Sequence, residues 1–162
     1  MHEMDLVGVR VELPSNNPIV LLKEQGGEGR ILPIFIGSPE ATAIAFALEE
    51  VEVPRPLTHD LLQLVLDELN ATLQRVVVTD LKNGTFFAEL HLHHAGQSHR
   101  ISCRPSDAVA LASRVGCPIF ADSEVLDEAG IIEPTEDLEE ADEVVEEFRE
   151  FIDNVDPEDF AS

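Results

Sequence analysis

Apolar side chains recur at every second position in the first part of the chain, which is typical of half-buried β-strands. Residues 4–13 alternate in this way, with an irregularity near Gly8. A turn then leads into a short apolar strand over 19–23, and a glycine-rich loop leads into a third strand over 30–36. Because this third strand is apolar on both faces, we expect it to lie in the middle of a sheet.

Helical spacing replaces this alternation in three later segments. Each is expected to begin at a small polar residue that caps the helix, namely Ser38, Thr58 and Ser106. The first segment is rich in alanine, which allows close approach to a neighbouring element. The second has apolar residues at helical intervals. A fourth, short helix is expected to begin at Ser123.

Residues 73–92 predict a β-hairpin. Two alternating segments flank Asn83-Gly84, a pair that accepts the positive backbone angles of a tight turn. Further strands are expected over 97–103 and 118–121. Together these segments predict an α+β fold, in which a mixed, mostly antiparallel sheet packs with three to four helices.

Charge divides the chain into two parts. The net charge is −23: residues 1–130 carry 19 acidic and 9 basic side chains, a balance of −10, and residues 131–162 carry 14 and 1, a balance of −13. Apolar residues in the acidic part keep helical spacing, at Leu138, Ala141, Val144, Val145, Phe148 and Ile152. We therefore predict a domain over 1–130 and an acidic C-terminal segment over 131–162, an amphipathic helix that docks loosely or binds a protein partner.

Composition narrows the class of protein. The chain is 44% hydrophobic, without an apolar run of the roughly 20 residues that a membrane span needs, and its first residues do not form a signal peptide. Cys103 and Cys117 have no metal-site spacing and are expected to be buried, inert thiols. These features predict a cytoplasmic protein without membrane contact. Its acidic field repels nucleic acid, so chemistry on nucleic acid would need local arginines or a bound cation.

One local pattern occurs twice: an arginine stands just before a helix start, with an acid in the first turn. The residues are Arg55 with Asp60, and Arg104 with Ser106 and Asp107. Helix N-termini attract anions, and an arginine adds a fork that binds phosphate through two hydrogen bonds. The alternative is purely structural, since small polar residues cap helices and first-turn acids favour the helix dipole.

Three carboxylates occupy the first turns of the predicted helices: Glu40, Asp60 and Asp107. If they converge, their oxygens suit Mg²⁺ or Mn²⁺. Two such ions about 4 Å apart would support phosphodiester hydrolysis. His59 would serve as the general base near neutral pH, or would simply be a polar residue at a helix start.

A second cluster consists of histidines near the end of the predicted hairpin: His91, His93, His94 and His99. Two of them share one strand face, which is compatible with a zinc site. The alternative is a solvated polar face.

Three segments in consistent order resemble the bifunctional nuclease (DNase/RNase) domain family, also catalogued as a domain of unknown function. The segments are Leu32-Pro33-Ile34-Phe35-Ile36-Gly37 with Glu40-Ala41, Arg55-Pro56-Leu57-Thr58-His59-Asp60-Leu61-Leu62, and Arg104-Pro105-Ser106-Asp107-Ala108-Val109-Ala110-Leu111-Ala112. The resemblance spans roughly residues 5–130. It departs from the family at Ser102, where members usually carry an acid.

The resemblance implies a compact mixed-sheet fold and hydrolysis of both DNA and RNA. One hypothesis is therefore a nuclease that depends on Mg²⁺ or Mn²⁺. Its residues would be the metal ligands Glu40, Asp60 and Asp107, the catalytic His59 with Asp60 and Asp107, and the substrate-binding Arg55, Arg104 and Ser106. The other hypothesis is a non-catalytic protein-binding or regulatory module of the same fold. The alanine-rich helix and the small domain also suggest a homo-oligomer.

Overall fold

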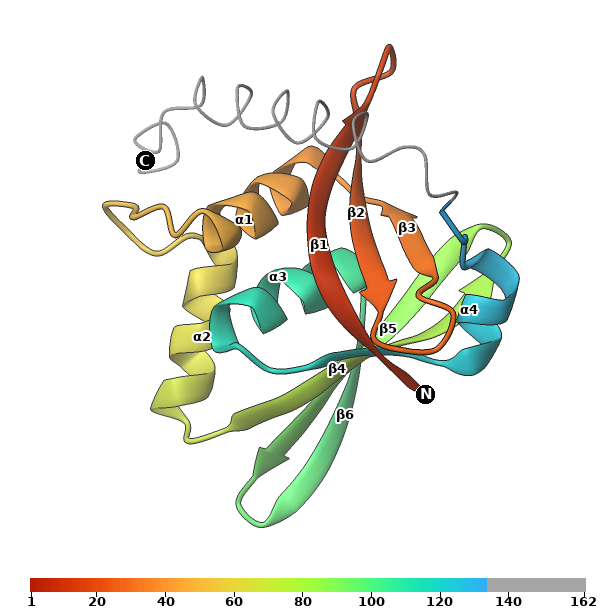
Figure 1. Ribbon diagram of the computed structural model, residues 1–162. Helices are drawn as coiled ribbons and strands as arrows, with labels where there is room; N and C mark the ends of the chain where they lie inside the picture. Colours follow the sequence, from red (N-terminus) through yellow and green to blue (C-terminus); the bar gives the residue numbers. More distant parts are fainter. Residues whose placement is uncertain (134–162) are drawn as a thin grey trace.

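Seven strands form one sheet within residues 1–133, the part of the chain that the computed structural model describes (Figure 1). The strands are β1 (His2–Glu12), β2 (Asn17–Glu24), β3 (Ile31–Phe35), β4 (Thr72–Lys82), β5 (Thr85–His94), β6 (Gln97–Cys103) and β7 (Ile119–Ala121). The helices are α1 (Ser38–Leu48), α2 (Thr58–Glu68), α3 (Pro105–Val115) and α4 (Ser123–Ala129). The expected acidic C-terminal helix lies outside the described residues.

The sheet is mixed and mostly antiparallel, as predicted. Its strand order is β3-β2-β1-β7-β4-β5-β6, and the β4–β7 pair is parallel while the other five are antiparallel. The short strand β7 therefore joins an N-terminal three-stranded half to the β4–β6 meander. The predicted turn at Asn83-Gly84 is present, with positive φ at both residues. The irregularity near Gly8 is a register shift between Leu6 and Gly8 in β1.

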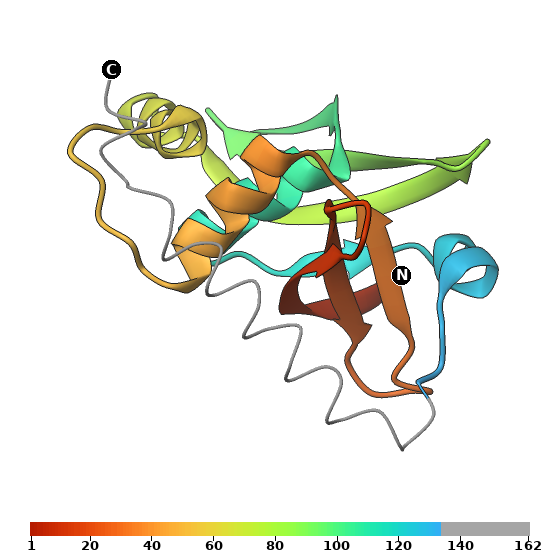
Figure 2. The same ribbon diagram turned by 90° about the horizontal axis from the view of Figure 1, so that it is seen from above.

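Helices α1, α2 and α3 gather on one side of the molecule, whereas α4 lies apart near β3 and β4 (Figure 2). The central helix is α3, which packs on β4 and β5 and contacts both α1 and α2. Alanines allow this close packing, and the buried ones are Ala41, Ala43 and Ala45 in α1 and Ala108, Ala110 and Ala112 in α3. The alanine-rich face of α1 is thus used inside the subunit and is not available for self-association.

The prediction that the third strand is central is wrong, because β3 is an edge strand of the sheet. Pro33 lies within β3, and a proline lacks the N–H that a second neighbouring strand would need. The apolar character of β3 has a different cause. Helix α4 packs against it, Ile31 forms an isolated bridge with Ile131, and Phe35 remains 64% exposed.

The helices begin at the predicted residues or, in α3, one residue earlier, but the predicted caps do not occupy the cap positions. The predicted caps lie inside the first turn in each case: Ser38, Thr58, Ser106 and Ser123. In α2 the N–H of Leu57 donates instead to Asp60 Oδ2 at 3.0 Å, so an acid in the first turn stabilises the end of the helix. In α3 Pro105 is the first helical residue, a position where its missing N–H costs nothing.

No helix in residues 1–133 is long and apolar enough to cross a membrane.

Candidate functional site

Arg104 links the N-terminal ends of α1 and α3. Its Nε donates to Asp107 Oδ2 at 2.8 Å, and its Nη2 donates to Glu40 Oε1 at 2.8 Å. These bonds join Arg104, which lies directly before α3, to a residue 64 positions away in the sequence. Two of the three predicted carboxylates therefore converge on one guanidinium.

Glu40 reaches this position because Gly37 has no side chain. The Glu40 carboxylate folds back over the start of α1, and a Cβ on Gly37 would overlap its Oε2. The backbone of Gly37 is ordinary extended backbone, with φ of −77°. Glycine is thus required here for close approach and not for an unusual backbone angle.

His59, at the start of α2, extends the cluster. Its Nε2 lies 2.9 Å from Asp107 Oδ1, and the ring is 8% exposed. Burial of Asp107 opposes its ionisation, but hydrogen bonds from Arg104 and His59 outweigh that effect and hold the pKa of Asp107 below its ordinary value. Because an ionised carboxylate only accepts hydrogen bonds, His59 Nε2 carries the proton and Nδ1 is the basic atom of the neutral ring.

Arg104 differs from its partners in its access to solvent. Its side chain is 64% exposed, while the side chains of Glu40 and Asp107 are 14% and 30% exposed. The hydrogen bonds that Arg104 donates to Asp107 and Glu40 raise its pKa. Since a guanidinium has five N–H groups, its two bonds to carboxylates leave donors for another oxygen anion. We call Glu40, His59, Arg104 and Asp107 the Arg104 cluster.

The other predicted site residues lie outside this cluster. Asp60 Oδ1 accepts from Arg114 Nε at 2.7 Å, an ion pair that fastens α2 to α3. Ser106 is buried in the first turn of α3. Arg55 is exposed in the connector before α2 and makes no hydrogen bond or ion pair with the described residues.

The Arg104 cluster contains ligand types that suit a divalent cation, but the space between its two carboxylates is filled by a guanidinium. Carboxylate oxygens such as those of Glu40 and Asp107 are the ligands that Mg²⁺ and Mn²⁺ prefer. In the structure, however, Arg104 occupies the position between them. Over residues 1–133, no three histidine, cysteine, aspartate or glutamate side chains are grouped to hold a metal ion. The three-carboxylate site stays a prediction, and Asp60 is the member that the geometry separates.

The histidines of the β4–β6 meander are likewise not arranged to hold a metal ion. His91 is engaged on both ring nitrogens: Nδ1 accepts from Arg75 Nε at 3.1 Å, and Nε2 lies 3.1 Å from Glu89 Oε2. His94 and His99 lie with ring centroids 6.3 Å apart, tilted by 46°. The four imidazoles do not form a zinc cluster within the described part of the chain.

A second arginine cluster, which sequence reasoning missed, connects β1, β2 and α4. Arg30 Nε and Nη2 donate to the Glu24 carboxylate at 3.1 and 3.3 Å, and Arg30 Nη1 donates to Asp127 at 2.9 Å. His2 Nδ1 lies 3.0 Å from Glu24 Oε1, a carboxylate with a side chain only 2% exposed. We call these four residues the Arg30 cluster. Its signal in the sequence was a glutamate and an arginine at the two ends of the glycine-rich loop.

The Arg30 cluster continues from His2 Nε2 to Ser123 Oγ at 3.1 Å. A serine, a histidine and a carboxylate that are hydrogen-bonded in this order also make up a nucleophilic triad. Here the N-terminal amine of Met1 also donates to Ser123 Oγ, at 3.3 Å. The contacts fasten the start of β1 to the start of α4, and we assign them a structural role.

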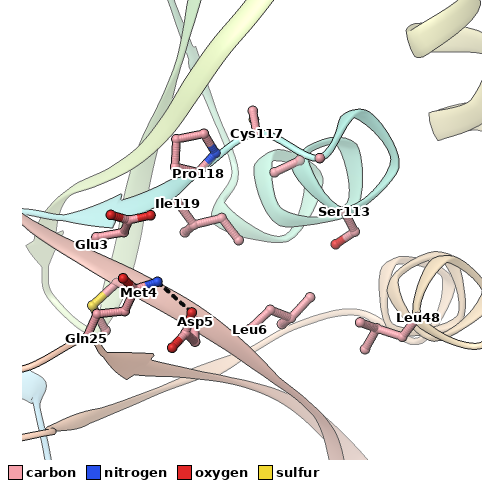
Figure 3. A pocket seen from close by; sticks show the side chains of 12 residues that line it. Glu3, Met4, Asp5, Leu6, Gln25, Leu48, Ser113, Cys117, Pro118 and Ile119 are labelled. Atoms are coloured by element: carbon pink, nitrogen blue, oxygen red, sulfur yellow. Dashed lines mark hydrogen bonds between the residues drawn. The ribbon is translucent and has the colours of Figure 1, made fainter.

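A cavity of about 480 Å³ lies at the opposite end of α3 from the Arg104 cluster (Figure 3). Figure 3 shows residues that line it, among them Leu48, Ser113 and Cys117. In its wall, Gln25 Nε2 donates to Asp5 Oδ1 at 2.6 Å. Burial raises the pKa of the Cys117 thiol to about 11, so this thiol stays protonated at neutral pH. Burial likewise raises the pKa of Cys103 to about 11. Neither cysteine is a ready nucleophile, as the sequence predicts.

Comparisons with known proteins agree with the sequence motifs. The model of the bifunctional nuclease domain matches residues 20–134, which contain the whole Arg104 cluster. An uncharacterized protein of Mycobacterium tuberculosis is 47% identical over 165 residues, 99% of this chain and 98% of its own length. Bifunctional nuclease 2 and bifunctional nuclease 1 of Arabidopsis thaliana are 30% and 28% identical over 66% and 64% of this chain. The chain spans about a third of the length of these plant proteins. It therefore belongs to the bifunctional nuclease domain family.

Proposed function

We propose that this protein is a nuclease that hydrolyses phosphodiester bonds of DNA and RNA, with its reaction centre at the Arg104 cluster. One observation carries the proposal: four side chains from three helix N-termini converge inside the region that matches the bifunctional nuclease domain. A histidine, two carboxylates and an exposed arginine are the side chains that phosphoryl transfer uses.

Arg104 binds the substrate phosphate in this proposal. Its exposed guanidinium keeps N–H donors beyond those used by Glu40 and Asp107, and a guanidinium matches two oxygens of a phosphate. The two carboxylates hold the guanidinium in place, so little side-chain entropy is lost when phosphate binds. Arg55, exposed four residues before His59, is a second arginine for the same polyanion.

His59 accepts the proton of the attacking water. Asp107 is its positioning residue, because the bond to Nε2 fixes the tautomer that leaves Nδ1 basic. An ionised Asp107 also stabilises the imidazolium that forms. Since the ring is 8% exposed, the first turn of α2 must shift slightly before water reaches it.

We further propose that Mg²⁺ or Mn²⁺ is the cofactor, held beside the Arg104 guanidinium, and not between the carboxylates, by Glu40 Oε2 and Asp107, since Arg104 bonds to Glu40 through Oε1 alone. With an uncharged His59, the Arg104 cluster has a net charge of −1, which opposes the approach of a phosphate. A divalent cation would neutralise that charge and lower the pKa of a bound water. The proposal rests on this charge balance and on the ligand chemistry of the two carboxylates.

The first experiment measures cleavage of single- and double-stranded DNA and of RNA by the full chain, alongside a mock purification. We expect chelation to abolish cleavage and Mg²⁺ or Mn²⁺ to restore it. Asp107→Asn keeps the shape but removes the charge. It should lower the cleavage rate by roughly 10²- to 10⁴-fold, as expected when the general base His59 loses the carboxylate that positions it. It should change the free energy of unfolding by only about 0.3–1 kcal/mol.

Asp127→Asn is the matched control, since it also removes one carboxylate from an arginine bridge, but in the Arg30 cluster. Its cleavage rate should equal that of the unmodified chain. Equal rates in Asp107→Asn and Asp127→Asn would contradict the proposed centre. Purified protein that cleaves no nucleic acid with either metal would contradict the nuclease itself.

A second candidate function is a non-catalytic module that binds a protein. Two observations favour it: Arg104 is already paired with two carboxylates, and the outer face of α2 exposes apolar side chains. In that function the Arg104 cluster would only hold three helices together. Asp107→Asn would then lower stability without an effect on any activity.

A further inference from the structure

Five apolar side chains lie at the surface along α2, each between 42% and 59% exposed: Leu61, Leu62, Leu64 and Val65 in the helix and Leu69 at its C-cap. We call this set the α2 face. His59 is the one buried residue of the helix, so α2 adds little to the core of the subunit. Exposed apolar patches of a few hundred Å² are often functional, commonly as protein–protein interfaces. The sequence predicted helical spacing of apolar residues in this segment, and the structure leaves most of these side chains exposed.

We propose that the α2 face binds a second copy of this chain, with the two α2 helices antiparallel across a two-fold axis. Such an axis places the same surface on both subunits, so a self-complementary apolar helix needs no other partner. The proposal does not rest on the nuclease function, although it gives Arg55 a second role.

The distribution of charge along α2 supports a second copy of the chain as the binding partner. The last turn carries Asp67 and Glu68 and no basic residue, which is unfavourable at the negative end of a helix dipole. At the other end, exposed Arg55 lies three residues before Thr58 and has no partner among the described residues. In an antiparallel pair, Glu68 of one copy comes close to the α2 N-terminus and Arg55 of the other.

Helical geometry puts Glu68 at the C-terminal end of the apolar surface. Glu68 follows Val65 by three residues and Leu64 by four, so the three side chains share one side of the helix. The 11 residues of α2 span about 16 Å. A crossing point near the middle of the helix therefore brings Glu68 within reach of Arg55 of the partner subunit.

The C-terminal segment of the same chain is the competing occupant, and its charge argues against it. Residues 131–162 hold 14 acidic and 1 basic side chains. Docked on the α2 face, they would meet Asp67 and Glu68, and like charges would repel each other. Five half-exposed side chains amount to roughly 400 Å² per subunit, or about 800 Å² for the pair, which is below the roughly 1,200 Å² of stable specific interfaces and corresponds to a weak, transient one. The expected dimer therefore dissociates on dilution.

The test is the molar mass of the full chain, measured by light scattering and sedimentation over a wide concentration range. The unmodified chain should shift from monomer to dimer as its concentration rises. Leu61→Glu and Val65→Glu should each stay monomeric over that range, with an unchanged circular dichroism spectrum, because both positions are solvent-exposed. Phe35→Glu, at an equally exposed apolar position on β3, is the control and should dimerise normally.

A charge exchange tests the antiparallel arrangement. Arg55→Glu and Glu68→Arg should each weaken dimerisation by roughly tenfold, and the double variant should regain most of the loss, because the pair is rebuilt across the two-fold axis. An unmodified chain that is monomeric at every concentration would overturn the proposal. So would a dimer that Leu61→Glu leaves intact. A monomer with α2 amides protected from hydrogen exchange would assign the face to the C-terminal segment instead.

Discussion

Two arginine clusters in this protein have the same chemistry and different surroundings. In each, one arginine bridges two carboxylates, and a histidine bonds to one of them. The Arg30 side chain is 14% exposed and its main partner Glu24 only 2%, whereas the Arg104 side chain is 64% exposed. Burial favours a structural role for the first cluster, and exposure leaves the second able to bind a ligand.

The difference shows that residue types alone do not distinguish a site from a structural ion pair. Hydrogen bonds from Arg30 lower the pKa of Glu24, even though burial acts in the opposite direction. The same competition lowers the pKa of Asp107. Each cluster therefore contains a carboxylate with a lowered pKa. Of the two arginines, only Arg104 also has N–H donors that face solvent.

Removal of Glu24 is expected to have the largest effect on stability. Glu24→Ala leaves Arg30 with exposed Asp127 and a 3.9 Å contact to exposed Glu28, and it removes one of the two partners of His2. We therefore expect a loss of about 3 kcal/mol in the free energy of unfolding. Glu40→Ala removes the corresponding carboxylate from the exposed arginine and should cost about 1 kcal/mol or less. Urea denaturation of both variants measures the comparison. Equal losses would show that the two clusters do not differ in their structural role.

Exchange of each arginine for lysine separates binding from stability. Arg104→Lys keeps the charge but loses the planar fork, so we expect cleavage to fall roughly tenfold while the melting temperature stays nearly constant. Arg30→Lys should do the reverse, with a clear drop in melting temperature and an unchanged rate per folded molecule. Thermal unfolding and initial cleavage rates on the same preparations provide the measurement. A rate loss in Arg30→Lys alone would move the centre to the other cluster.

The pH dependence of stability is a third way to compare the clusters. Glu24 and Asp107 both have folded-state pKa values below their ordinary values of 4.5 and 3.8. Each therefore contributes stability that is present above its ordinary pKa and is lost as the pH falls through its folded-state pKa. Unfolding measured from pH 6 down to pH 3 should show a steep loss below about pH 4.5 in the unmodified chain. Glu24→Ala should flatten this slope more than Asp107→Asn does.

Gly37→Ala is expected to have the smallest effect on stability. A methyl group at this position would displace the Glu40 carboxylate and so break its bond to Arg104. Because Arg104 is exposed and keeps Asp107, the loss in the free energy of unfolding should be within about 1 kcal/mol. A titration of Mg²⁺ or Mn²⁺ against cleavage should show weaker metal binding. An unchanged titration would indicate that Glu40 is not a metal ligand.

The sequence by itself determined the parts of the fold that depend on local pattern. The alternation of apolar and polar residues predicted the paired strands β4 and β5, and Asn83-Gly84 marked the turn between them. The motifs around Arg55 and Arg104 marked two helix starts and the family. These features are readable because periodicity, turn residues and short motifs act over a few neighbouring positions.

Only the tertiary structure decided which charges meet. Glu40 and Asp60 occupy equivalent first-turn positions, yet Glu40 binds Arg104 and Asp60 binds Arg114. Likewise, α2 and α3 both have helical apolar spacing, but the apolar side of α3 is buried while that of α2 is exposed. The reason is physical: spacing along a helix specifies a face, whereas the packing of helices on the sheet determines what that face contacts.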